Sequence, residues 1–526
     1  MSQSALTDSI SALLASGTPH WGNNGTVLNG SSVGAAATVT YSFLTSARQI
    51  SSADSAGFAA MNSAQQAAVR QALAAWSAVA NITFTEIANP TAADVAFGTN
   101  RQYGQSAAYA YYPSTASQGG QVFLANDSAT NTNPTTGSYG YMTIIHEIGH
   151  ALGLKHPGNY NAGSDEGTEG PYLSSAQDNY AYSIMSYNDS DALPSNTYLT
   201  GPSLYDIAAI QYLYGANMSA APGDTSYTLN TGSFITLWDP NGHNSLNGSA
   251  QTAALSLDLR DGQFSSAGST TFLALAYGTK MQQAIGGSGN DSFTVNSLGN
   301  ALDGGAGTDT VVFSGSRAQY SVQQLDGSRY IVNGANGTDI LTNIEYLRFS
   351  DSSTALSPAA SGSFDTLRYI ASNGDLIAAF GTDTAAAAQH LANSGVYEGR
   401  SLSGFDPYNY LAGYGDLMSA FGTDATAATN HFITNGYREG RNSSLFDTLS
   451  YEASNPDLIA AFGNNREAVE LHYIQFGRFE GRSLGRFDAA AYLAANPDVN
   501  AAVGGSLSGA RQHYVSFGYA EGRALA

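Results

Sequence analysis

Apolar and polar residues alternate with different periods along the chain, and each period predicts a different kind of structure. Within residues 1–220, a β-type stretch at 38–43 precedes a helical pattern at 63–80, where Val69, Leu73 and Trp76 recur every three or four positions. Ser63 and Gln66 have the spacing of a capping box and predict where this helix begins. Further strands are predicted at 82–87, 94–97 and 121–124. This region should be an α+β domain in which a helix packs on a sheet.

Residues 221–360 are rich in Gly, Asn, Ser and Thr and contain short alternating apolar runs, which predict an all-β region. Residues 361–526 instead contain four gap-free units of 41 residues, which predict an all-α repeat array. Each unit is expected to be a helix pair that buries its aromatic face only against its neighbours, with Asn455-Pro456 and Asn496-Pro497 as helix starts. Five positions recur in every unit: Phe364, Phe405, Phe446 and Phe487; Tyr369, Tyr410, Tyr451 and Tyr492; Asp375, Asp416, Asp457 and Asp498; His390, His431, His472 and His513; and Glu398, Glu439, Glu480 and Glu521.

The length of 526 residues also predicts a multidomain protein. The chain has 41 acidic and 19 basic residues and a net charge of −22. Nucleic acids and anionic membranes bind clustered Lys and Arg, so neither is expected as the main partner, whereas cations are suitable ligands. No apolar run reaches the roughly 18 residues of a membrane helix, so no transmembrane segment is expected.

Cysteine is absent, which excludes disulfides, thiolate metal sites and a cysteine nucleophile. The first eight residues contain no basic side chain, and the apolar run at 10–15 is too short for the hydrophobic part of a secretory signal. No cleavable N-terminal signal is therefore predicted.

The strongest chemical motif runs from His146 to His156 and predicts a catalytic zinc site. On a helix, His146 and His150 lie one turn apart on one face, and Glu147 lies beside them as a base for water. Gly153 should end the helix and let the chain turn back, so that His156 becomes the third ligand. Three nitrogen ligands leave a fourth position open, which is typical of catalytic rather than structural zinc.

This motif resembles that of the metzincin zinc peptidases, and the residues around it resemble the serralysin family within them. The resemblance implies that Met185 forms an apolar floor under the metal, in the segment called the Met-turn. It also implies that Tyr187 approaches the zinc and hydrogen-bonds the oxyanion, so both Glu147 and Tyr187 are expected to be catalytic. The segments that carry the resemblance are 41–43, 74–76, 137–141, 183–187 and 205–217.

The resemblance also implies a substrate-binding strand. Residues 119–124 are similar to the family's edge strand above the active site, where a peptide binds by strand addition. The expected substrate-binding residues are Gln121, Val122, Phe123 and Leu124.

Two glycine-rich segments predict a calcium site. They start 18 residues apart and resemble the nine-residue calcium β-roll repeat of RTX proteins. Loops two repeats apart stack on the same side of a roll, so the two segments are expected to bind Ca²⁺ jointly through carboxylates and backbone carbonyls. The predicted residues are Gly286, Gly287, Gly289 and Asp291 in the first loop and Gly304, Gly305, Gly307 and Asp309 in the second.

The repeated histidines of the array are not expected to bind metal. Neighbouring helical units lie about 10 Å apart, whereas two ligands of one zinc bring their nitrogens within about 4 Å of each other. They are predicted to be structural residues.

Together these patterns predict a secreted, extracellular zinc endopeptidase that uses Zn²⁺ and Ca²⁺ and hydrolyses protein or peptide substrates. The resemblance implies export by a type I secretion machinery. Two alternatives stay open: a processing protease retained at the cell surface by a partner of residues 361–526, and a non-catalytic surface binding protein on the same fold. The last requires a broken zinc site, and no ligand is missing from this motif.

Overall fold

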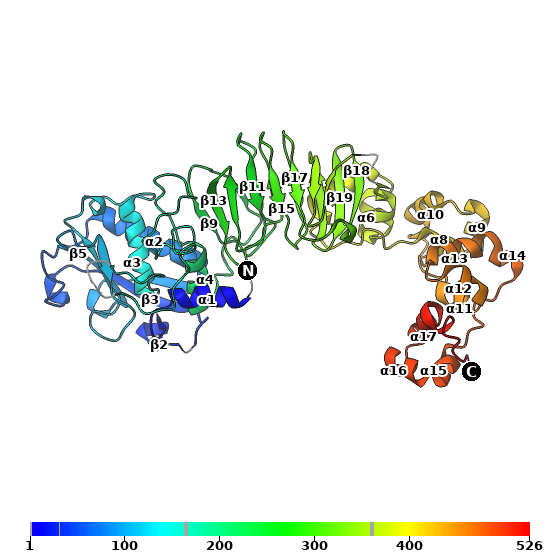
Figure 1. Cartoon of the computed structure of the whole chain (residues 1–526), viewed down its shortest axis with the longest axis horizontal. Helices are drawn as coiled ribbons and strands as arrows, with labels where there is room; N and C mark the ends of the chain where they lie inside the picture. The colour runs from blue at the N-terminus through cyan, green and yellow to red at the C-terminus, as the bar shows by residue number, and fades with distance from the viewer. Residues whose placement is uncertain (1–2, 31, 162–166, 358–361, 526) are drawn as a thin grey trace. The chain divides into compact units, whose positions relative to one another are not determined.

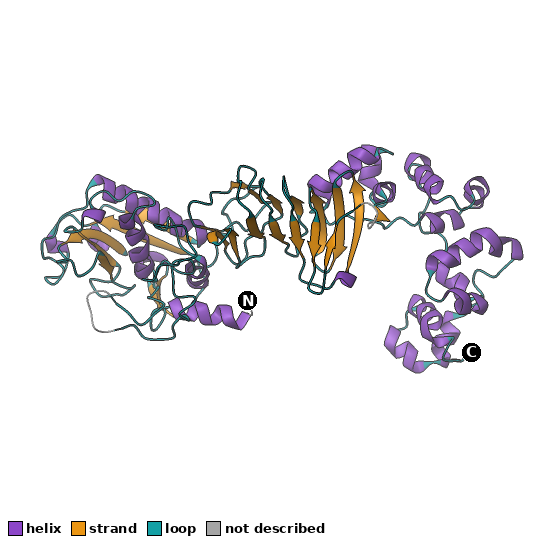
Figure 2. Cartoon of the chain, turned by 45° about the horizontal axis from the view of Figure 1, so that its top comes forward, coloured by secondary structure: helices purple, strands orange, loops and turns teal. Residues whose placement is uncertain are grey.

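The structure, a computed structural model of the whole chain, describes residues 3–30, 32–161, 167–357 and 362–525. The chain forms two compact units: Met1–Val322 with Ser328–Ser361, and Gln323–Gly327 with Gly362–Ala526. Helices and strands segregate along the chain, which confirms the predicted multidomain class (Figure 2). The domain boundary predicted near residue 220 stays a prediction, and the one predicted at residue 361 lies outside the described residues.

The first unit begins with an α+β domain built on a five-stranded sheet of order β4-β3-β5-β7-β6 (Figure 1). All its pairs are parallel except the antiparallel pair of β6 and β7. The strands are β3 (Ala37–Phe43), β4 (Ile82–Glu86), β5 (Val95–Asn100), β6 (Ala108–Ala110) and β7 (Gln121–Ala125), with a separate hairpin of β1 (Pro19–Trp21) and β2 (Val27–Asn29). The helices are α1 (Gln3–Leu13), α2 (Ser63–Val79), α3 (Tyr139–Ala151) and α4 (Leu204–Tyr214).

Helix α2 packs its apolar face into the core of this domain. Val69, Leu73 and Trp76 are buried, and the Trp76 indole donates a hydrogen bond to the carbonyl of Ile145 in α3. The capping box is one residue earlier than predicted: Asn62 accepts from the amide of Gln65, whose side chain accepts from the Asn62 amide. The Asn62 amide side chain also donates to the Thr132 carbonyl, which explains why Asn rather than the following Ser takes the cap.

The β region contains two sheets, and consecutive strands from β8 to β11 and from β13 to β17 belong alternately to one sheet and the other. One runs β18-β19-β20-β16-β14-β10-β8 and the other β22-β21-β17-β15-β11-β12-β13-β9. In the register, Gln283 pairs with Ala301 and Ser292 with Thr310, so strands 18 residues apart stack in parallel as predicted. The strands are β8 (Ser226–Thr228), β9 (Ile235–Leu237), β10 (Ser245–Asn247), β11 (Leu255–Asp258), β12 (Phe264–Ala267), β13 (Thr270–Leu275), β14 (Gln283–Ile285), β15 (Ser292–Thr294), β16 (Ala301–Asp303), β17 (Thr310–Val312), β18 (Tyr320–Asp326), β19 (Arg329–Gly334), β20 (Gly337–Thr342), β21 (Tyr346–Arg348) and β22 (Ser353–Ala355).

The second unit is helical, apart from β23 (Gly362–Ser363), but its repeats are not helix pairs. Each repeat has three short α-helices followed by one turn of π-helix that starts after the repeated histidine. The helices are α5 (Thr366–Ala371), α6 (Gly374–Phe380), α7 (Thr384–His390) and η6 (Leu391–Gly395); α8 (Pro407–Ala412), α9 (Gly415–Phe421), α10 (Ala425–His431) and η7 (Phe432–Gly436); α11 (Thr448–Ala453), α12 (Pro456–Phe462), α13 (Arg466–His472), η8 (Tyr473–Gly477) and α14 (Arg478–Glu480); and α15 (Ala489–Ala495), α16 (Pro497–Val503), α17 (Leu507–His513) and η9 (Tyr514–Gly518).

The repeated tyrosine makes contacts inside its own repeat, so, contrary to the prediction, the aromatic face is not buried only against the neighbouring repeats. Contacts between repeats are present as well, because Tyr492 lies in one apolar cluster with Leu449 and Ile459 of the preceding repeat. Tyr451 is fully buried, its hydroxyl lies 2.9 Å from Nδ1 of His472, and a Cβ on Gly477 would lie 2.0 Å from that hydroxyl. The predicted proline starts are present, but the Asn455 side chain does not cap its helix. Its amide instead donates to the carbonyls of Tyr451 and Ser483.

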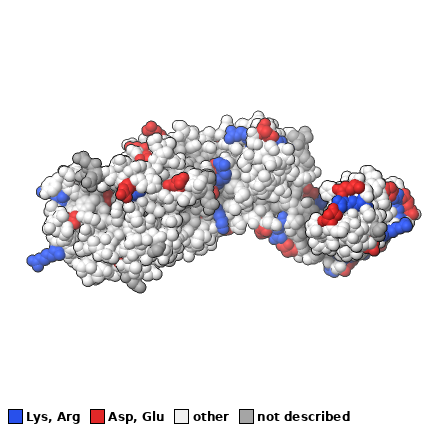
Figure 3. All heavy atoms as spheres, turned by 60° about the horizontal axis from the view of Figure 1, so that its bottom comes forward, with Lys and Arg blue, Asp and Glu red and all other residues white. Residues whose placement is uncertain are grey.

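Charged side chains form ion pairs on the surface of the array. The arginine of each Glu-Gly-Arg triplet contacts the glutamate two residues earlier and the repeated aspartate, as Arg441 does with Glu439 and Asp416. Figure 3 shows basic and acidic atoms lying together on the surface of this array. Among the described residues, no helix combines the length and the apolar composition needed to span a bilayer.

Candidate metal and active site

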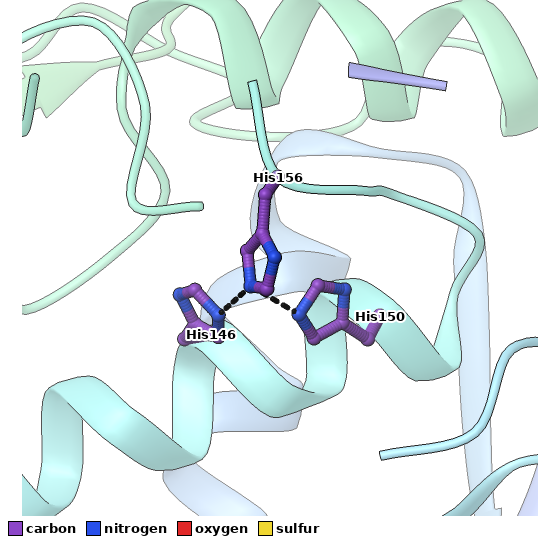
Figure 4. Close-up of side chains that lie close together, drawn as sticks. All are labelled: His146, His150 and His156. Atoms are coloured by element: carbon purple, nitrogen blue, oxygen red, sulfur yellow. Dashed lines mark hydrogen bonds between the residues drawn. The ribbon is translucent and has the colours of Figure 1, made fainter. Parts of the chain in front are cut away.

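Helix α3 and the turn after it bring three histidines together (Figure 4). Ser138 caps the helix by accepting from the Tyr141 amide, and His146 and His150 follow on one face. Gly153 has a φ of +110°, and a Cβ there would lie 2.2 Å from the carbonyl oxygen of Pro19, so only glycine fits this turn. His156 then reaches back over the helix. Among the described residues, these histidines are the one group of three His, Asp or Glu side chains whose ligand atoms converge.

The hydrogen bonds of the three rings fix which nitrogen faces the common centre. Each Nδ1 lies against a carbonyl oxygen, at 2.8 Å for His146 and Ile184, 2.7 Å for His150 and Leu154, and 3.1 Å for His156 and Tyr160. A carbonyl only accepts, so each Nδ1 carries the proton of a neutral ring and each Nε2 presents a lone pair.

The Nε2 atom of His156 lies 3.1 Å from that of His146 and 3.0 Å from that of His150. Three lone pairs this close repel one another unless a cation lies between them. Ligand nitrogens at about 2.0–2.1 Å from a tetrahedral zinc have a similar spacing, so the residues fit this metal.

Burial keeps the imidazoles neutral. It lowers the pKa of His146 to about 4 and, together with the charge of His146, the pKa of His150 to about 3. The pKa of His156 falls further for the same reasons. Neutral imidazole is the form that binds a metal.

Glu147 and Tyr187 line a groove beside the three histidines. One hollow of about 330 Å³ is bordered by His146 and a second of about 130 Å³ by His150 and His156, and both are bordered by Ala108, Glu147 and Tyr187. The Oε2 atom of Glu147 is buried without a hydrogen-bond partner among the described residues, and burial raises its pKa to about 8. The Tyr187 ring lies 4.5 Å from the His156 ring.

Met185 lies under the helix of the triad, and a buried carboxylate holds its segment in place. A Cβ on Gly149 would lie 2.5 Å from the Met185 sulfur, so this glycine permits the close approach. The Asp206 carboxylate accepts from the Ser183 hydroxyl at 2.6 Å and from the Ile184 amide at 2.6 Å. Because the Ile184 carbonyl orients His146, Asp206 acts on the triad through this segment. This role was not predicted from the sequence. The capping-box spacing of Ser203 and Asp206 is a local signal that could have drawn attention to Asp206.

A second network, also missed from the sequence, supports Tyr187. The Tyr160 hydroxyl donates to Asp178 at 2.6 Å, and its ring stacks on Tyr187 at 4.8 Å between centroids. Ser186 donates to the same Asp178 oxygen at 2.7 Å. The Tyr160 ring therefore contacts Tyr187, and the Tyr160 carbonyl contacts the third histidine, His156.

The N-terminal segment is attached to the turn that carries His156. Leu14 forms an antiparallel bridge with Leu154, and the Lys155 amide donates to the Leu13 carbonyl at 2.8 Å. The buried Lys155 ammonium donates to three carbonyls, those of Ala12, His156 and Pro171. The third histidine is thus connected to the end of α1.

The predicted substrate strand is wrong. Residues Gln121–Ala125 form β7, which is buried and paired on both sides, with β5 and with β6. An interior strand cannot accept a further strand. The edge of this sheet next to the groove is β6, whose Ala108 and Ala110 line it.

Comparisons with known proteins agree with this geometry. The family described as Matrixin matches residues 36–162, and the one described as Peptidase M10 serralysin C terminal matches residues 206–387. The chain is thus similar to serralysin metallopeptidases over the part that carries the triad and the β region. It is 37% identical to a metallopeptidase AprA of Pseudomonas marginalis over 50% of this chain and 61% of the relative. It is 38% identical to a serralysin C of Dickeya chrysanthemi over 50% and 60%, and 36% identical to a serralysin of Proteus mirabilis over 51% and 62%.

The chain therefore spans about three fifths of the length of these curated relatives. The family matches end at residue 387, so residues 388–526 of the repeat array lie beyond them. The similarity to serralysins thus concerns the domains that carry the triad and the β region.

The two glycine-rich loops stack as expected, and their carboxylates differ in their hydrogen bonds. Both oxygens of Asp291 accept backbone amides, from Leu255 and Gly287. In Asp309, Oδ1 accepts the Asp291 amide, while Oδ2 is buried without a partner among the described residues. Burial and the nearby carboxylates of Asp291 and Glu345 raise the pKa of Asp309 to about 6. A buried oxygen among like charges fits a cation such as Ca²⁺.

Proposed function

We propose that the chain is a zinc-dependent endopeptidase that hydrolyses peptide bonds in protein substrates. The convergence of three neutral Nε2 atoms beside the unpartnered carboxylate oxygen of Glu147 supports this proposal most directly. His146, His150 and His156 would hold the zinc. When bound, zinc supplies Lewis-acid chemistry, because it lowers the pKa of water and polarises a carbonyl.

The side chains around the triad carry the proton transfers. Glu147 accepts a proton from the attacking water and returns it to the leaving amide nitrogen, since Glu147 lines the groove and its Oε2 has no hydrogen-bond partner among the described residues. Tyr187 donates a hydrogen bond to the carbonyl oxygen as negative charge develops there. The stacking of Tyr160 on Tyr187 limits the positions that this phenol adopts.

Peptide substrates would bind along β6 by strand addition, so that their backbone passes Glu147. The alanines of β6 leave room for a substrate backbone close to this strand. The hollow bordered by Met142 and Ile184 would take a substrate side chain on one side of the cleaved bond.

Calcium would bind at the loops of Asp291 and Asp309, with the glycine carbonyls as further ligands. The unpartnered Asp309 oxygen supports this assignment. The expected ligand loops remain Gly286–Asp291 and Gly304–Asp309, and the expected role of the ion is structural.

A single substitution separates this proposal from a non-catalytic binding protein. Glu147→Ala should keep its zinc and lose about 10²-fold or more in turnover, which is the usual contribution of general acid–base catalysis. The assay is a proteome-wide cleavage profile of the wild type and the variant, with zinc content measured in both. Full activity in the variant would overturn the proposed mechanism, and no cleavage by the zinc-loaded wild type would overturn the proposed function.

We further propose that the enzyme is secreted through a type I machinery and that the array retains it at a surface partner. The array carries exposed aromatic side chains, among them Phe476, Phe479 and Phe517, which are accessible to a partner. A chain truncated before residue 362 should cleave a short peptide at a near-wild-type rate and lose surface association. Loss of peptide cleavage by the folded truncated chain would contradict this division of roles.

A further inference from the structure

The strand that borders the groove has little support from its own sheet. β6 contains three residues, Ala108–Ala110, and pairs with β7 alone. Its flanks add the bonds from the Tyr111 amide to the Gln121 carbonyl and from the Ala125 amide to the Ala107 carbonyl, both 2.9 Å. A short edge strand with few ladder bonds frays easily unless side chains hold it.

Two tyrosines of this segment reach the same buried carboxylate. The hydroxyls of Tyr109 and Tyr111 donate to Oδ1 of Asp54 at 2.8 and 3.0 Å. Asp54 is 4% exposed, lies more than fifty residues earlier in the chain, and is oriented by the Ser51 hydroxyl, which donates to its Oδ2 at 2.6 Å. One carboxylate thus holds two residues on the same face of the edge segment.

A buried amide completes this network. The Asn100 side chain donates to the Tyr109 hydroxyl at 2.6 Å and to the backbone carbonyl of Asp54 at 2.9 Å. The Tyr109 ring packs on the fully buried Phe123 of β7, with 5.3 Å between centroids. Burial and the carboxylate both raise the pKa of Tyr111 to about 12, so its hydroxyl remains a donor at neutral pH.

We infer that Asp54 is a positioning residue for substrate binding: it holds β6 through Tyr109 and Tyr111 so that the edge facing the groove stays ready to pair with a peptide. This inference rests on the proposed function. Asp54 itself does not line the groove, whereas Ala108 and Ala110 do, so it acts through the strand. Hydrogen bonds to an ionised acceptor are stronger than neutral ones, which suits a clamp that must resist fraying.

The position of the clamp predicts a particular kinetic effect. Loosening β6 weakens the pairing with an extended peptide, whereas the triad, Glu147 and Tyr187 keep their own supports. Asp54→Ala should therefore raise KM for an extended peptide about five- to tenfold, because a change of this size corresponds to the loss of about one net hydrogen bond. The variant should change kcat by less than about twofold. A short peptide that makes few bonds to β6 should be affected less.

The test combines these kinetics with hydrogen exchange in the zinc-loaded protein. Asp54→Ala and the double variant Tyr109→Phe/Tyr111→Phe should speed amide exchange over residues 107–112, and Asp54→Asn, which keeps an acceptor oxygen, should retain most of the protection. The matched control is Tyr41→Phe, because Tyr41 donates to the Glu86 carboxylate at 2.9 Å on β3 and β4, at the far side of the same sheet. This control should leave KM and the exchange of residues 107–112 unchanged.

Unchanged KM and unchanged exchange in the folded variants would overturn the inference, as would an equal fall in kcat for short and extended peptides. If Asp54→Ala does not fold, the double Tyr→Phe variant decides, because both rings stay packed. A wild type that cleaves no peptide would refute the proposed function, and the exchange measurement would still decide whether Asp54 holds the strand.

Discussion

The molecule contains two sets of histidines that differ in where Nε2 points. In both sets Nδ1 is engaged: by carbonyl oxygens in the triad, and by tyrosine hydroxyls at 2.9–3.3 Å in the four repeats. Spacings of four and six residues bring three Nε2 atoms to one centre, whereas a period of 41 residues places each histidine in its own repeat. The chain spacing, rather than the number of histidines, decides which set suits a metal.

The largest expected effect tests this difference directly. His156→Ala should lower zinc affinity by more than the roughly 100-fold seen when only an outer partner of a ligand is lost. His472→Ala should leave zinc affinity unchanged and destabilise the array by about 1 kcal/mol, because it removes one hydrogen bond to Tyr451. Competition with a metal indicator dye and thermal unfolding measure the two effects. A loss of zinc in His472→Ala would break the comparison.

The next effect sharpens the chemical side of the comparison. Tyr187→Phe should lower kcat by about 10²-fold and change KM little, since the proposed hydrogen bond strengthens as the oxyanion forms. Tyr198→Phe is a matched control, because Tyr198 is 41% exposed and Tyr187 is 42% exposed, but Tyr198 does not line the groove. A rise in KM with an unchanged kcat would contradict the role given to Tyr187.

Within the array, one repeat departs from the others at a buried position. Glu452 is fully buried, its two oxygens have no partner among the described residues, and burial raises its pKa to about 7; the equivalent residues are Ile370, Leu411 and Leu493. Because the pKa of this carboxyl is raised in the folded state, its ionisation destabilises the fold increasingly as pH rises from its unfolded pKa of about 4.3 to its folded pKa of about 7. Array stability should therefore fall between about pH 4.5 and 8.

Glu452→Leu should reduce this pH dependence and stabilise the array by about 2–3 kcal/mol at pH 8. Part of the dependence should remain, because burial also raises the pKa of Glu470 in the same repeat to about 7. Chemical unfolding at pH 5 and pH 8 measures it. The exposed Glu467→Leu of the same repeat serves as control and should leave the pH dependence in place. An unchanged slope in Glu452→Leu would show that the buried carboxyl does not titrate in this range.

The smallest effect concerns the loops of the β region. Removal of calcium with EGTA should speed hydrogen exchange over residues 286–312 and lower the melting temperature by a few degrees. A shift of this size corresponds to a loss of about 1 kcal/mol in the free energy of unfolding of a domain of this size. The exchange of the triad helix should not change. Unchanged exchange across both loops would remove the calcium assignment.

Much of the site follows from the sequence because it is local. A helical period and one obligatory glycine within eleven residues suffice to place His146, His150 and His156 around one point. The supports of the site could not be predicted, because they join distant segments: Asp206 meets Ser183, and Asp54 meets Tyr109. No periodic pattern in the sequence indicates that these residues contact each other.

The error about the substrate strand has a physical cause. The run Val122-Phe123-Leu124 is apolar on consecutive positions, which is typical of a strand covered on both faces and paired inside a sheet. The edge strand of the structure is Ala108–Ala110. It is too short and too weakly apolar to be predicted as a strand from the sequence. The repeats were identified from their period, but the π-helical turns after each histidine depend on tyrosine and glycine packing that the period does not encode.

The attachment of α1 to the turn of His156 also determines what a cleavage in the N-terminal segment would do. Cleavage before Ala12 would leave intact the carbonyls of Ala12 and Leu13 that receive the Lys155 ammonium and amide. Cleavage after Leu14 would release both acceptors together and leave a buried ammonium with two of its three partners. Loss of residues 1–14 would therefore loosen the turn that carries the third histidine.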